Sequence, residues 1–451
     1  MADERMANPR VLQALQQART RLEALERARS EPLALVGMAC RLPGEVDEPE
    51  AFWRLLHEGR DAVGEVPADR WDNEALYDTN RHAPGKTYTR RGAFLRRPDQ
   101  FDADFFGISP REAASLDPQQ RLLLETSWEA LEDAGLAGGP LSGTAAGVYV
   151  GIGQSHYAQL KLHTPELSAI DAYAGSGGLL CFASGRLSYW LGLQGPSLSV
   201  DTACSSSLVA LHLACQSLRS GECSLAVVGG VHLHLAPHVS LFLSRTGVLA
   251  PDGRSKAFDA AADGFGRGEG CVVLVLKRLS DAQAHGDTIH ALIRGSAVNH
   301  DGESAGLTVP NDKAQEQVIR EALKNARVEP SEVSFIEAHG TGTQLGDPLE
   351  VRALEAVFAP HHTPEHPLFL GSVKSSVGHL EAAAGLAGLL NIAFWGGMGV
   401  AAHRAGGLAP NGADGLSFAG LDQRTEGAWR PSPGSVYPTL QQLTDEGLLE
   451  E

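Results

Sequence analysis

The chain has 451 residues, 43% of them hydrophobic and 20% charged, which excludes wholesale disorder and leaves room for about three domains or one large duplicated domain. Its 37 Lys and Arg against 55 Asp and Glu give a net charge of −18, which argues against a surface that binds the nucleic-acid backbone. Six scattered cysteines without a CxxC pair exclude a disulfide scaffold and favour a cytoplasmic protein.

The first expected element is a helix over residues 8–29, which follows a charged N-terminus without the apolar core of a signal peptide. Asn8 suits the N-cap of this helix, and Pro9 suits its first position. Apolar residues recur in it at the spacing of a coiled-coil seam: Val11, Leu15, Ala18, Leu22 and Leu25. Two interpretations stay open, a helix packed on its own domain and a short dimerisation or docking helix. We assign residues 1–30 to such a docking or coiled-coil-like segment.

From Pro32 onward, short runs rich in β-branched residues alternate with stretches rich in Ala and Leu. The runs expected to form strands are 33–36, 147–150, 225–228, 272–276 and 333–336. The clearest helices are expected over 120–131 and 208–218. Strands that alternate with helices indicate an α/β fold, in which helices cover a layered sheet.

Residues 382–402 carry no charge, and one interpretation of them is a membrane span. The stretch is rich in Gly and Ala and is interrupted by Gly396 and Gly397, so a helix of small residues buried inside the protein is the favoured interpretation. Residues 396–428 lack periodicity and are expected to form an irregular connector. Within the compact polar segment 429–451, residues 435–449 could form a short helix.

A cysteine stands where an expected strand meets an expected helix, in the segment VDTACSSSL that ends at Leu208. A thiol at such a turn lies near the positive end of the helix dipole, which favours the nucleophilic thiolate. Cys204 is therefore a candidate nucleophile. The alternative is a small buried thiol that only fills the start of the helix.

Two histidines stand in similar turns. His339 follows a strand and opens a Gly/Thr loop, EAHGTGT, while His379 ends GSVKSSVGH in front of the Ala-rich helix. A histidine at a helix N-terminus tends to stay neutral, and a neutral imidazole can donate a hydrogen bond to a developing oxyanion. Each loop could also be a polar turn without a catalytic role. Together with Cys204, the two histidines suggest a nucleophile and two oxyanion stabilisers, whereas a thiol protease needs only one histidine.

These segments resemble the β-ketoacyl synthase (ketosynthase) family, in the form found in modular type I polyketide synthases. The resemblance extends from about Glu31 to Phe394 and includes PLALVGMACRLPG, FDADFFGISPREAASLDPQQRLLLETSWEALEDAG, DGRSKAFDAAADGFGRGEG and EAHGTGTQLGDPLE. It implies a thiolase-like duplicated α/β/α/β/α sandwich, usually a homodimer, whose second half is incomplete at its C-terminus here. The expected organisation is a helical segment 1–30, a ketosynthase domain 31–395, a connector 396–428 and a winged-helix-like fragment 429–451.

The resemblance also implies roles for the residues singled out. Cys204 would take an acyl chain from the phosphopantetheine thioester of an acyl carrier protein. His339 and His379 would stabilise the enolate formed when a malonyl-type extender decarboxylates, and attack of that carbanion on the acyl group would give a β-ketoacyl product. Thr341 and Thr343 would line the pantetheine arm. Lys374 would support the histidines electrostatically.

No cofactor is expected to stay bound, since the phosphopantetheine belongs to the carrier protein. The expected partners are the acyl carrier protein, a second copy of the chain and, through the N-terminal helix, other polyketide synthase modules. A cysteine at 204, in place of glutamine, resembles elongating ketosynthases and not loading domains.

Three departures from the family pattern are visible. The glycine-rich motif of the type GFGGTNAH, which completes the oxyanion hole, is not found after Trp395. Gly178 and His232 stand where asparagine is more usual. The tail from Trp429 resembles the recognition-helix region of PadR-like winged-helix regulators, and we interpret it as a fusion or frameshift scar. The alternatives are therefore an inactive dimerising or carrier-docking remnant and, more weakly, a regulator fragment.

Overall fold

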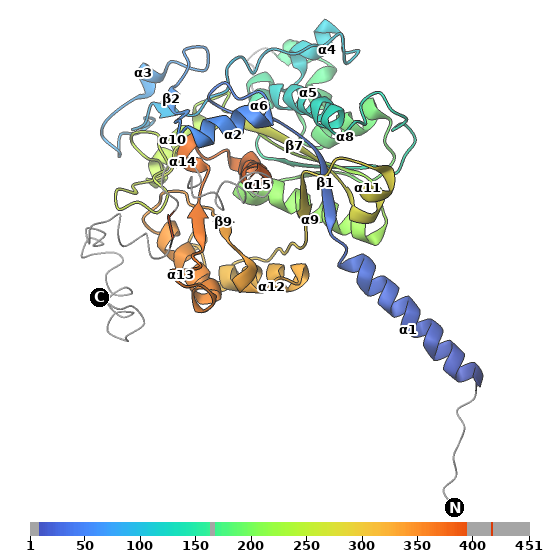
Figure 1. The fold of residues 1–451 in the computed structure, drawn as a ribbon. Helices are drawn as coiled ribbons and strands as arrows, with labels where there is room; N and C mark the ends of the chain where they lie inside the picture. The colour runs from blue at the N-terminus through green and yellow to red at the C-terminus, as the bar shows by residue number, and fades with distance from the viewer. Residues whose placement is uncertain (1–8, 163–166, 395–415, 418–451) are drawn as a thin grey trace, which may run out of the picture.

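The computed structural model of the chain describes residues 9–162, 167–394 and 416–417 (Figure 1). The helix expected over 435–449, the winged-helix-like fragment 429–451 and the connector, apart from residues 416–417, lie outside the described residues.

A six-stranded mixed sheet forms the centre of the molecule, in the order β5-β4-β6-β7-β1-β8. Strand β4 runs parallel to β5 and β6, whereas β7 is antiparallel to both β6 and β1. The bounds of these strands are β1 Leu33–Arg41, β4 Gly147–Ile152, β5 Ser197–Val200, β6 Ala226–His232, β7 Gly270–Arg278 and β8 Ala291–Ile293. Strands β1, β4, β6 and β7 are buried on both faces, which explains why their sequences read as continuous apolar runs.

Helices cover both faces of this sheet. Along β1, Leu33 and Leu35 belong to a core shared with helices α2, α9 and α15, while Ala34 and Val36 face a second core shared with α5 and α8. Successive side chains of a strand point to opposite faces, so one strand serves both cores. The covering helices are α2 Pro49–His57, α5 Pro118–Asp133, α8 Cys181–Leu191, α9 Ser206–Ser220 and α15 Ala384–Phe394.

A second, smaller sheet has the order β11-β10-β9. Strand β10 pairs in parallel with β9 and antiparallel with β11. Helices α12 and α13 pack on this sheet around a third core that includes Leu354, Val357 and Leu370. The bounds are β9 Phe335–Glu337, β10 Phe369–Gly371, β11 Leu416–Ser417, α12 Asp312–Ala326 and α13 Gly346–Phe358.

Helix α15 lies between the two sheets, and its small residues make this position possible. A Cβ on Gly385 would come within 2.4 Å of Leu208 in α9, and a Cβ on Gly388 within 2.8 Å of the Glu337 side chain in β9. The Ala- and Gly-rich composition therefore reflects close packing on both sides, as the sequence indicated. Among the described residues, no helix combines the length and the hydropathy needed to cross a bilayer.

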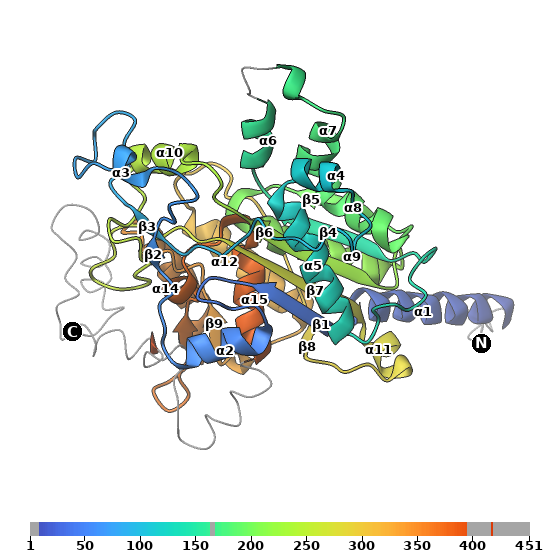
Figure 2. The same cartoon turned by 90° about the horizontal axis from the view of Figure 1, so that it is seen from above.

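Helix α1 (Pro9–Arg29) projects away from the rest of the molecule (Figures 1 and 2). Leu15 and Leu22 of its apolar seam are exposed. The interpretation of α1 as a helix packed along its own domain is therefore wrong for these residues. The docking role of the segment stays a prediction.

The expected strands and helices are present, with shifted ends. The strand expected at 333–336 begins only at Phe335, because Pro330–Glu332 form a 3-10 turn that Val333 terminates. The remaining short elements are β2 Gly64–Glu65, β3 Arg91–Gly92, α3 Asn73–Leu76, α4 Pro110–Ser115, α6 His156–Leu162, η1 Leu167–Ala169, α7 Tyr173–Gly178, η2 Ala203–Ser205, α10 His238–Thr246, α11 Leu279–His285, η3 Pro330–Glu332, η4 Ala359–His361, α14 Lys374–Val377 and η5 Glu381–Ala383.

Candidate active site

Cys204 stands on a sharp turn between β5 and α9, as the sequence indicated. The turn is the short helix η2, and the preceding Ala203 has a φ of 55°, a left-handed conformation that is unfavourable for a residue with a Cβ. Side chains hold the turn, since Asp201 Oδ1 accepts from the Ala203 N–H at 3.0 Å and Ser206 Oγ accepts from the Thr202 N–H at 2.9 Å. The cysteine is exposed.

His379 lies buried between α14 and η5. Its backbone is fixed by two hydrogen bonds, from the His379 N–H to the Gly266 carbonyl at 2.7 Å and from the Gly268 N–H to the His379 carbonyl at 2.8 Å. The Glu381 N–H donates to His379 Nδ1 at 2.9 Å. Because Nδ1 accepts this bond, the hydrogen of a neutral ring lies on Nε2, which is free to donate to a substrate.

His339 follows β9 and reaches the same place from the second sheet. The rings of His339 and His379 meet edge to face, with centroids 5.5 Å apart. The N–H groups of His339 and Gly340 donate to the Glu350 carboxylate at 2.6 and 2.8 Å, which fixes the backbone at the start of the loop. Unlike His379, His339 is exposed. The fold thus brings together two histidines that are forty residues apart in the chain.

The loop after His339 contains both predicted threonines. Thr341 is buried, and its hydroxyl lies 3.1 Å from that of Thr343. The Asp347 carboxylate accepts from the Gly342 N–H at 3.1 Å and ties the loop to the start of α13. Gly342 has a φ of 78°, and a Cβ at this position would come within 2.6 Å of the Lys256 backbone nitrogen. The glycine is therefore required by both conformation and space.

Lys374 is buried at the first position of α14, and burial lowers the pKa of its ammonium. The buried carboxylates of Glu337 and Glu350 counteract this effect. Burial raises the pKa of Glu337 to about 7, although Glu337 accepts hydrogen bonds from the Val373 N–H at 2.8 Å and from Asn391 Nδ2 at 2.9 Å. In its protonated form Lys374 acts on the site from the interior, because its charge lowers the pKa of Cys204.

The protonation states differ in one respect from the sequence expectation. Desolvation and the charge of Glu381 raise the pKa of the Cys204 thiol to about 11, and Lys374 only partly opposes them. The expectation that the turn favours a thiolate is therefore wrong for the free protein. Desolvation and Lys374 lower the pKa of His339 and of His379, so both imidazoles are neutral. Because Cys204 and His339 are exposed, water reduces the size of these shifts but not their sign.

The two departures inside the domain have structural consequences. Gly178 ends α7, and a Cβ there would come within 2.6 Å of Ala158 Cβ, so the close approach of α6 depends on glycine. His232 is buried at the end of β6, where its Nε2 lies 3.0 Å from a Glu381 carboxylate oxygen. These two positions therefore shape the surroundings of the site and do not disrupt them.

Four residues of the site were not singled out from the sequence: Ala203, Glu337, Glu350 and Glu381. The three glutamates lie inside motifs that were recognised, and a carboxylate within an otherwise apolar or Gly-rich motif is the signal that could have identified them. Ala203 gave no signal, because a positive φ at alanine is set by the tertiary structure.

The comparisons agree with this geometry. A family model described as "Beta-ketoacyl synthase, N-terminal domain" matches residues 30–282, and "Beta-ketoacyl synthase, C-terminal domain" matches residues 290–395. The pikromycin polyketide synthase component PikAII of Streptomyces venezuelae is 55% identical over 80% of this chain. The polyketide synthase GfsB of Streptomyces halstedii is 54% identical over 80% of it.

Those relatives are much longer. The chain spans 10% of the pikromycin component and 6% of GfsB. Among solved structures, the oxazolomycin ketosynthase domain OzmH KS7 of Streptomyces albus is 43% identical with a TM-score of 0.77, and the match covers 81% of this chain and 62% of that chain. The ketosynthase from module 6 of the bacillaene synthase of Bacillus subtilis is 39% identical with a TM-score of 0.74, over 81% of this chain and 61% of that one.

Proposed function

Because the chain belongs to the β-ketoacyl synthase family, we propose that it is a condensing acyltransferase of polyketide biosynthesis. The observation that carries this proposal is the meeting of the Cys204 turn with two neutral histidines. Helix η2, which bears Cys204, contacts η5 and α15, directly after His379. His339 enters from the other sheet, with its ring 5.5 Å from that of His379.

In the first step, the Cys204 sulfur attacks the carbonyl of an acyl thioester on a carrier protein. A carbon–sulfur bond forms to Cys204 and the bond to the pantetheine sulfur breaks. The proton of the Cys204 thiol passes to the departing pantetheine thiolate, so the step is neutral overall. The raised pKa of the Cys204 thiol keeps it protonated until the substrate arrives.

In the second step, a malonyl-type thioester loses carbon dioxide, and the electrons of the broken carbon–carbon bond delocalise onto the thioester oxygen. Neutral His339 and His379 each donate an N–H to that oxygen, and His379 does so from Nε2. The enolate carbon then attacks the acyl carbonyl on Cys204. The new carbon–carbon bond forms, the Cys204 thiolate departs and a proton from water restores the thiol.

The remaining site residues support this chemistry. Thr341 and Thr343 offer neighbouring hydroxyls for the amides of the pantetheine arm. Buried Lys374 favours negative charge both on the Cys204 sulfur and on the enolate oxygen. The chain holds no cofactor of its own in this proposal, because the phosphopantetheine remains covalently attached to the acyl carrier protein.

We further propose that the chain forms a homodimer through the edge of its large sheet. Strand β5 is the terminal strand of that sheet, and Leu198 on it is 43% exposed. An edge strand presents backbone groups on its outer side with which a second copy can pair, and β5 leads directly into the turn that bears Cys204. Contacts with other synthase modules are assigned to α1, whose Leu15 and Leu22 are exposed.

A cytoplasmic location is proposed from the cysteines. All six are free, including the exposed Cys181 and Cys204, and a reducing compartment keeps exposed thiols from forming disulfides.

Mass spectrometry after incubation with an acyl-carrier thioester tests the function. Acylation of Cys204, followed by a β-ketoacyl product once malonyl-carrier protein is added, is expected. The Cys204→Ala variant should lose acylation, whereas His379→Ala should keep acylation and lose condensation. Acylation without condensation in the unmodified chain would favour the carrier-docking remnant, and no acylation at all would leave only a scaffold role.

A further inference from the structure

A buried cluster of three side chains lies beside the active site but outside the chemistry described above. His232 and His234 stand at the end of β6 and just beyond it, with only 4% and 1% of their surfaces exposed. Glu381 reaches them from η5. His232 Nε2 lies 3.0 Å from Glu381 Oε2 and 3.2 Å from His234 Nδ1, and the three atoms lie within 4.8 Å of one another.

Hydrogen bonds among these three side chains cannot satisfy all of their nitrogen and oxygen atoms. A neutral imidazole nitrogen carries either one hydrogen or one lone pair, so His232 Nε2 cannot make a full hydrogen bond to both neighbours. If His232 Nε2 donates its one hydrogen to Glu381, the same hydrogen cannot also make a full hydrogen bond to His234 Nδ1. If it accepts from His234, its lone pair faces the carboxylate. The outer nitrogens of the pair, His232 Nδ1 and His234 Nε2, are buried without a hydrogen-bond partner within the described part of the chain.

We propose that His232, His234 and Glu381 bind a divalent transition-metal ion, with Zn²⁺ as the representative. Two imidazole nitrogens and one carboxylate oxygen are the donors that such ions take, at about 2.0–2.2 Å from the metal. A cation placed between the three atoms is attracted by all of their lone pairs at once. His232 Nε2 lies 3.0 Å and 3.2 Å from the donor atoms of the other two side chains, so small side-chain rotations can bring all three onto one ion.

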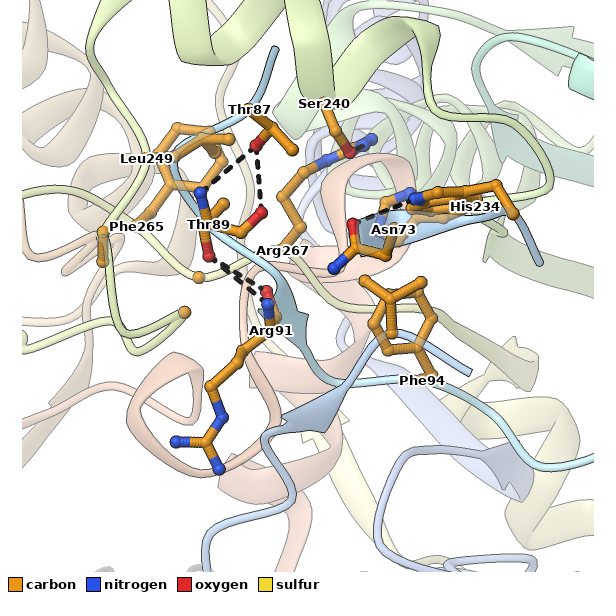
Figure 3. A pocket seen from close by; sticks show the side chains of 15 residues that line it. Asn73, Thr87, Thr89, Arg91, Phe94, His234, Ser240, Leu249, Phe265 and Arg267 are labelled. Carbon is orange, nitrogen blue, oxygen red and sulfur yellow. Dashed lines mark hydrogen bonds between the residues drawn. The ribbon is translucent and has the colours of Figure 1, made fainter. Parts of the chain in front are cut away.

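The surroundings orient the carboxylate ligand of the proposed site. Arg267 Nε donates to Glu381 Oε1 at 2.6 Å, which orients Oε2 toward the histidines. The positive charge of Arg267 also offsets the negative charge of Glu381 within the cluster. His234 and Arg267 also line a small cavity of about 20 Å³, shown in Figure 3, which is large enough for one water.

The proposed ion would act on the active site through the backbone. The Glu381 N–H donates to Nδ1 of His379, so a metal that fixes the Glu381 side chain also fixes the segment that sets the tautomer of this histidine. The ion would touch neither the substrate nor Cys204. Metal binding can therefore be measured whether or not the chain catalyses condensation.

Calorimetric titration of the chelator-treated full chain with Zn²⁺ tests this site. One equivalent should bind, and His232→Asn and His234→Gln should each weaken binding about a hundredfold or more. His238→Gln is the matched control, because His238 is an exposed histidine a few residues further along the chain and should leave binding unchanged. Glu381→Gln is avoided, since it would leave buried Arg267 without its ion pair.

Cys204 with its two histidines is the competing place for zinc, and two measurements separate the sites. Cys204→Ala should retain the full zinc affinity. Co²⁺ bound to the unmodified chain should give a spectrum without a thiolate charge-transfer band, a readout that does not depend on whether any variant folds. Unchanged affinity in folded His232→Asn or His234→Gln, loss of binding in Cys204→Ala, or a thiolate band would each overturn the proposal.

Discussion

The reactivity of the site depends on how single residues are surrounded. Cys204 sits on a strained turn at the start of α9, yet desolvation and the charge of Glu381 raise the pKa of its thiol and keep it protonated. Lys374 opposes both effects from the interior. Desolvation raises the pKa of Cys204 and the helix dipole lowers it. Which effect is larger therefore depends on groups that are distant in the chain, namely Glu381 and Lys374.

Alkylation of Cys204 reports this balance, because only the thiolate reacts with iodoacetamide. The rate should rise with pH up to a midpoint above the ordinary value of a thiol. Lys374→Met removes the group that lowers the pKa of Cys204, so the midpoint should move to still higher pH and the rate at pH 8 should fall.

The alkylation experiment is made in a Cys181→Ser background, since Cys181 is the other exposed thiol. Circular dichroism of each variant checks that the fold is retained. A midpoint that moves to lower pH in Lys374→Met would contradict the assigned role of the lysine.

A second residue-level prediction concerns Gly342 in the threonine loop. Gly342→Ala should lower the free energy of unfolding by about 2–4 kcal/mol, since the new Cβ must adopt a left-handed conformation and approaches the Lys256 nitrogen to 2.6 Å. Gly221→Ala is the matched control, because Gly221 has the same φ of 78° and open space around its Cβ position. Urea denaturation measures both. Equal losses in the two variants would show that the close contact contributes nothing.

At the level of secondary-structure elements, α15 and α1 differ strongly in how far the rest of the described chain covers them. Helix α15 is packed between two sheets, and glycines stand where it approaches them most closely, at Gly385 and Gly388. Helix α1 has an apolar seam that the rest of the described chain leaves exposed at Leu15 and Leu22. The first is explained by the domain itself, whereas the exposed seam of the second is what a docking helix would present, and that role stays a prediction.

Deletion of residues 1–29 should therefore leave the thermal unfolding midpoint of the domain unchanged, because residues 13–22 of the helix are exposed. Glu31 must be kept, since its carbonyl accepts from Arg219 Nε and its carboxylate from the Ser280 N–H. Differential scanning calorimetry measures the midpoint. A clear decrease would mean that α1 folds back on the domain in solution.

The N-terminus of α12 gives a further prediction at this scale. Asn311 caps the helix by accepting from the Lys313 and Ala314 N–H groups, and its Nδ2 donates to the Asp301 carbonyl. Asn311→Ala should cost about 0.5–2 kcal/mol of unfolding free energy. Asn311→Asp keeps the capping oxygen and should lose less. If the aspartate variant were the less stable one, the Asp301 contact and not the cap would dominate.

For the molecule as a whole, the two halves differ in completeness within the described residues. The large sheet has six strands, and helices cover both of its faces. Its last strand, β8, pairs with β1, whereas β9 pairs with β10 in the smaller sheet. Strands β8 and β9 do not pair with each other, so the two sheets stay separate. Several large apolar side chains are exposed in the part of the chain that the structure describes, including Leu208, Leu292, Val298, Leu307 and Ile392. Exposed apolar side chains of this kind are available to a partner or to an apolar dye.

The exposed surface should bind an apolar dye. Fluorescence of 8-anilinonaphthalene-1-sulfonate is expected to increase on addition of the native chain, before any denaturant is present. Replacing Leu292 and Val298 by serine should reduce the signal. No fluorescence increase with the unmodified chain would mean that another part of the molecule covers these residues in solution.

The sequence alone determined the α/β class, most strand positions and the identity of Cys204, His339 and His379. It could do so because strand and helix patterns are local and because each catalytic residue stands in a short, recognisable turn. The fold class and the family were confirmed by the structure and the comparisons. The roles of the site residues stay predictions.

Only the tertiary structure decided the rest. The raised pKa of Cys204, the free seam of α1 and the cluster of His232, His234 and Glu381 could not be predicted, because each depends on groups that are distant in sequence. Burial and electrostatic fields arise from what the fold brings together in space. A sequence motif shows which side chains are present, whereas the packing of the sheets around α15 determines which of them come into contact.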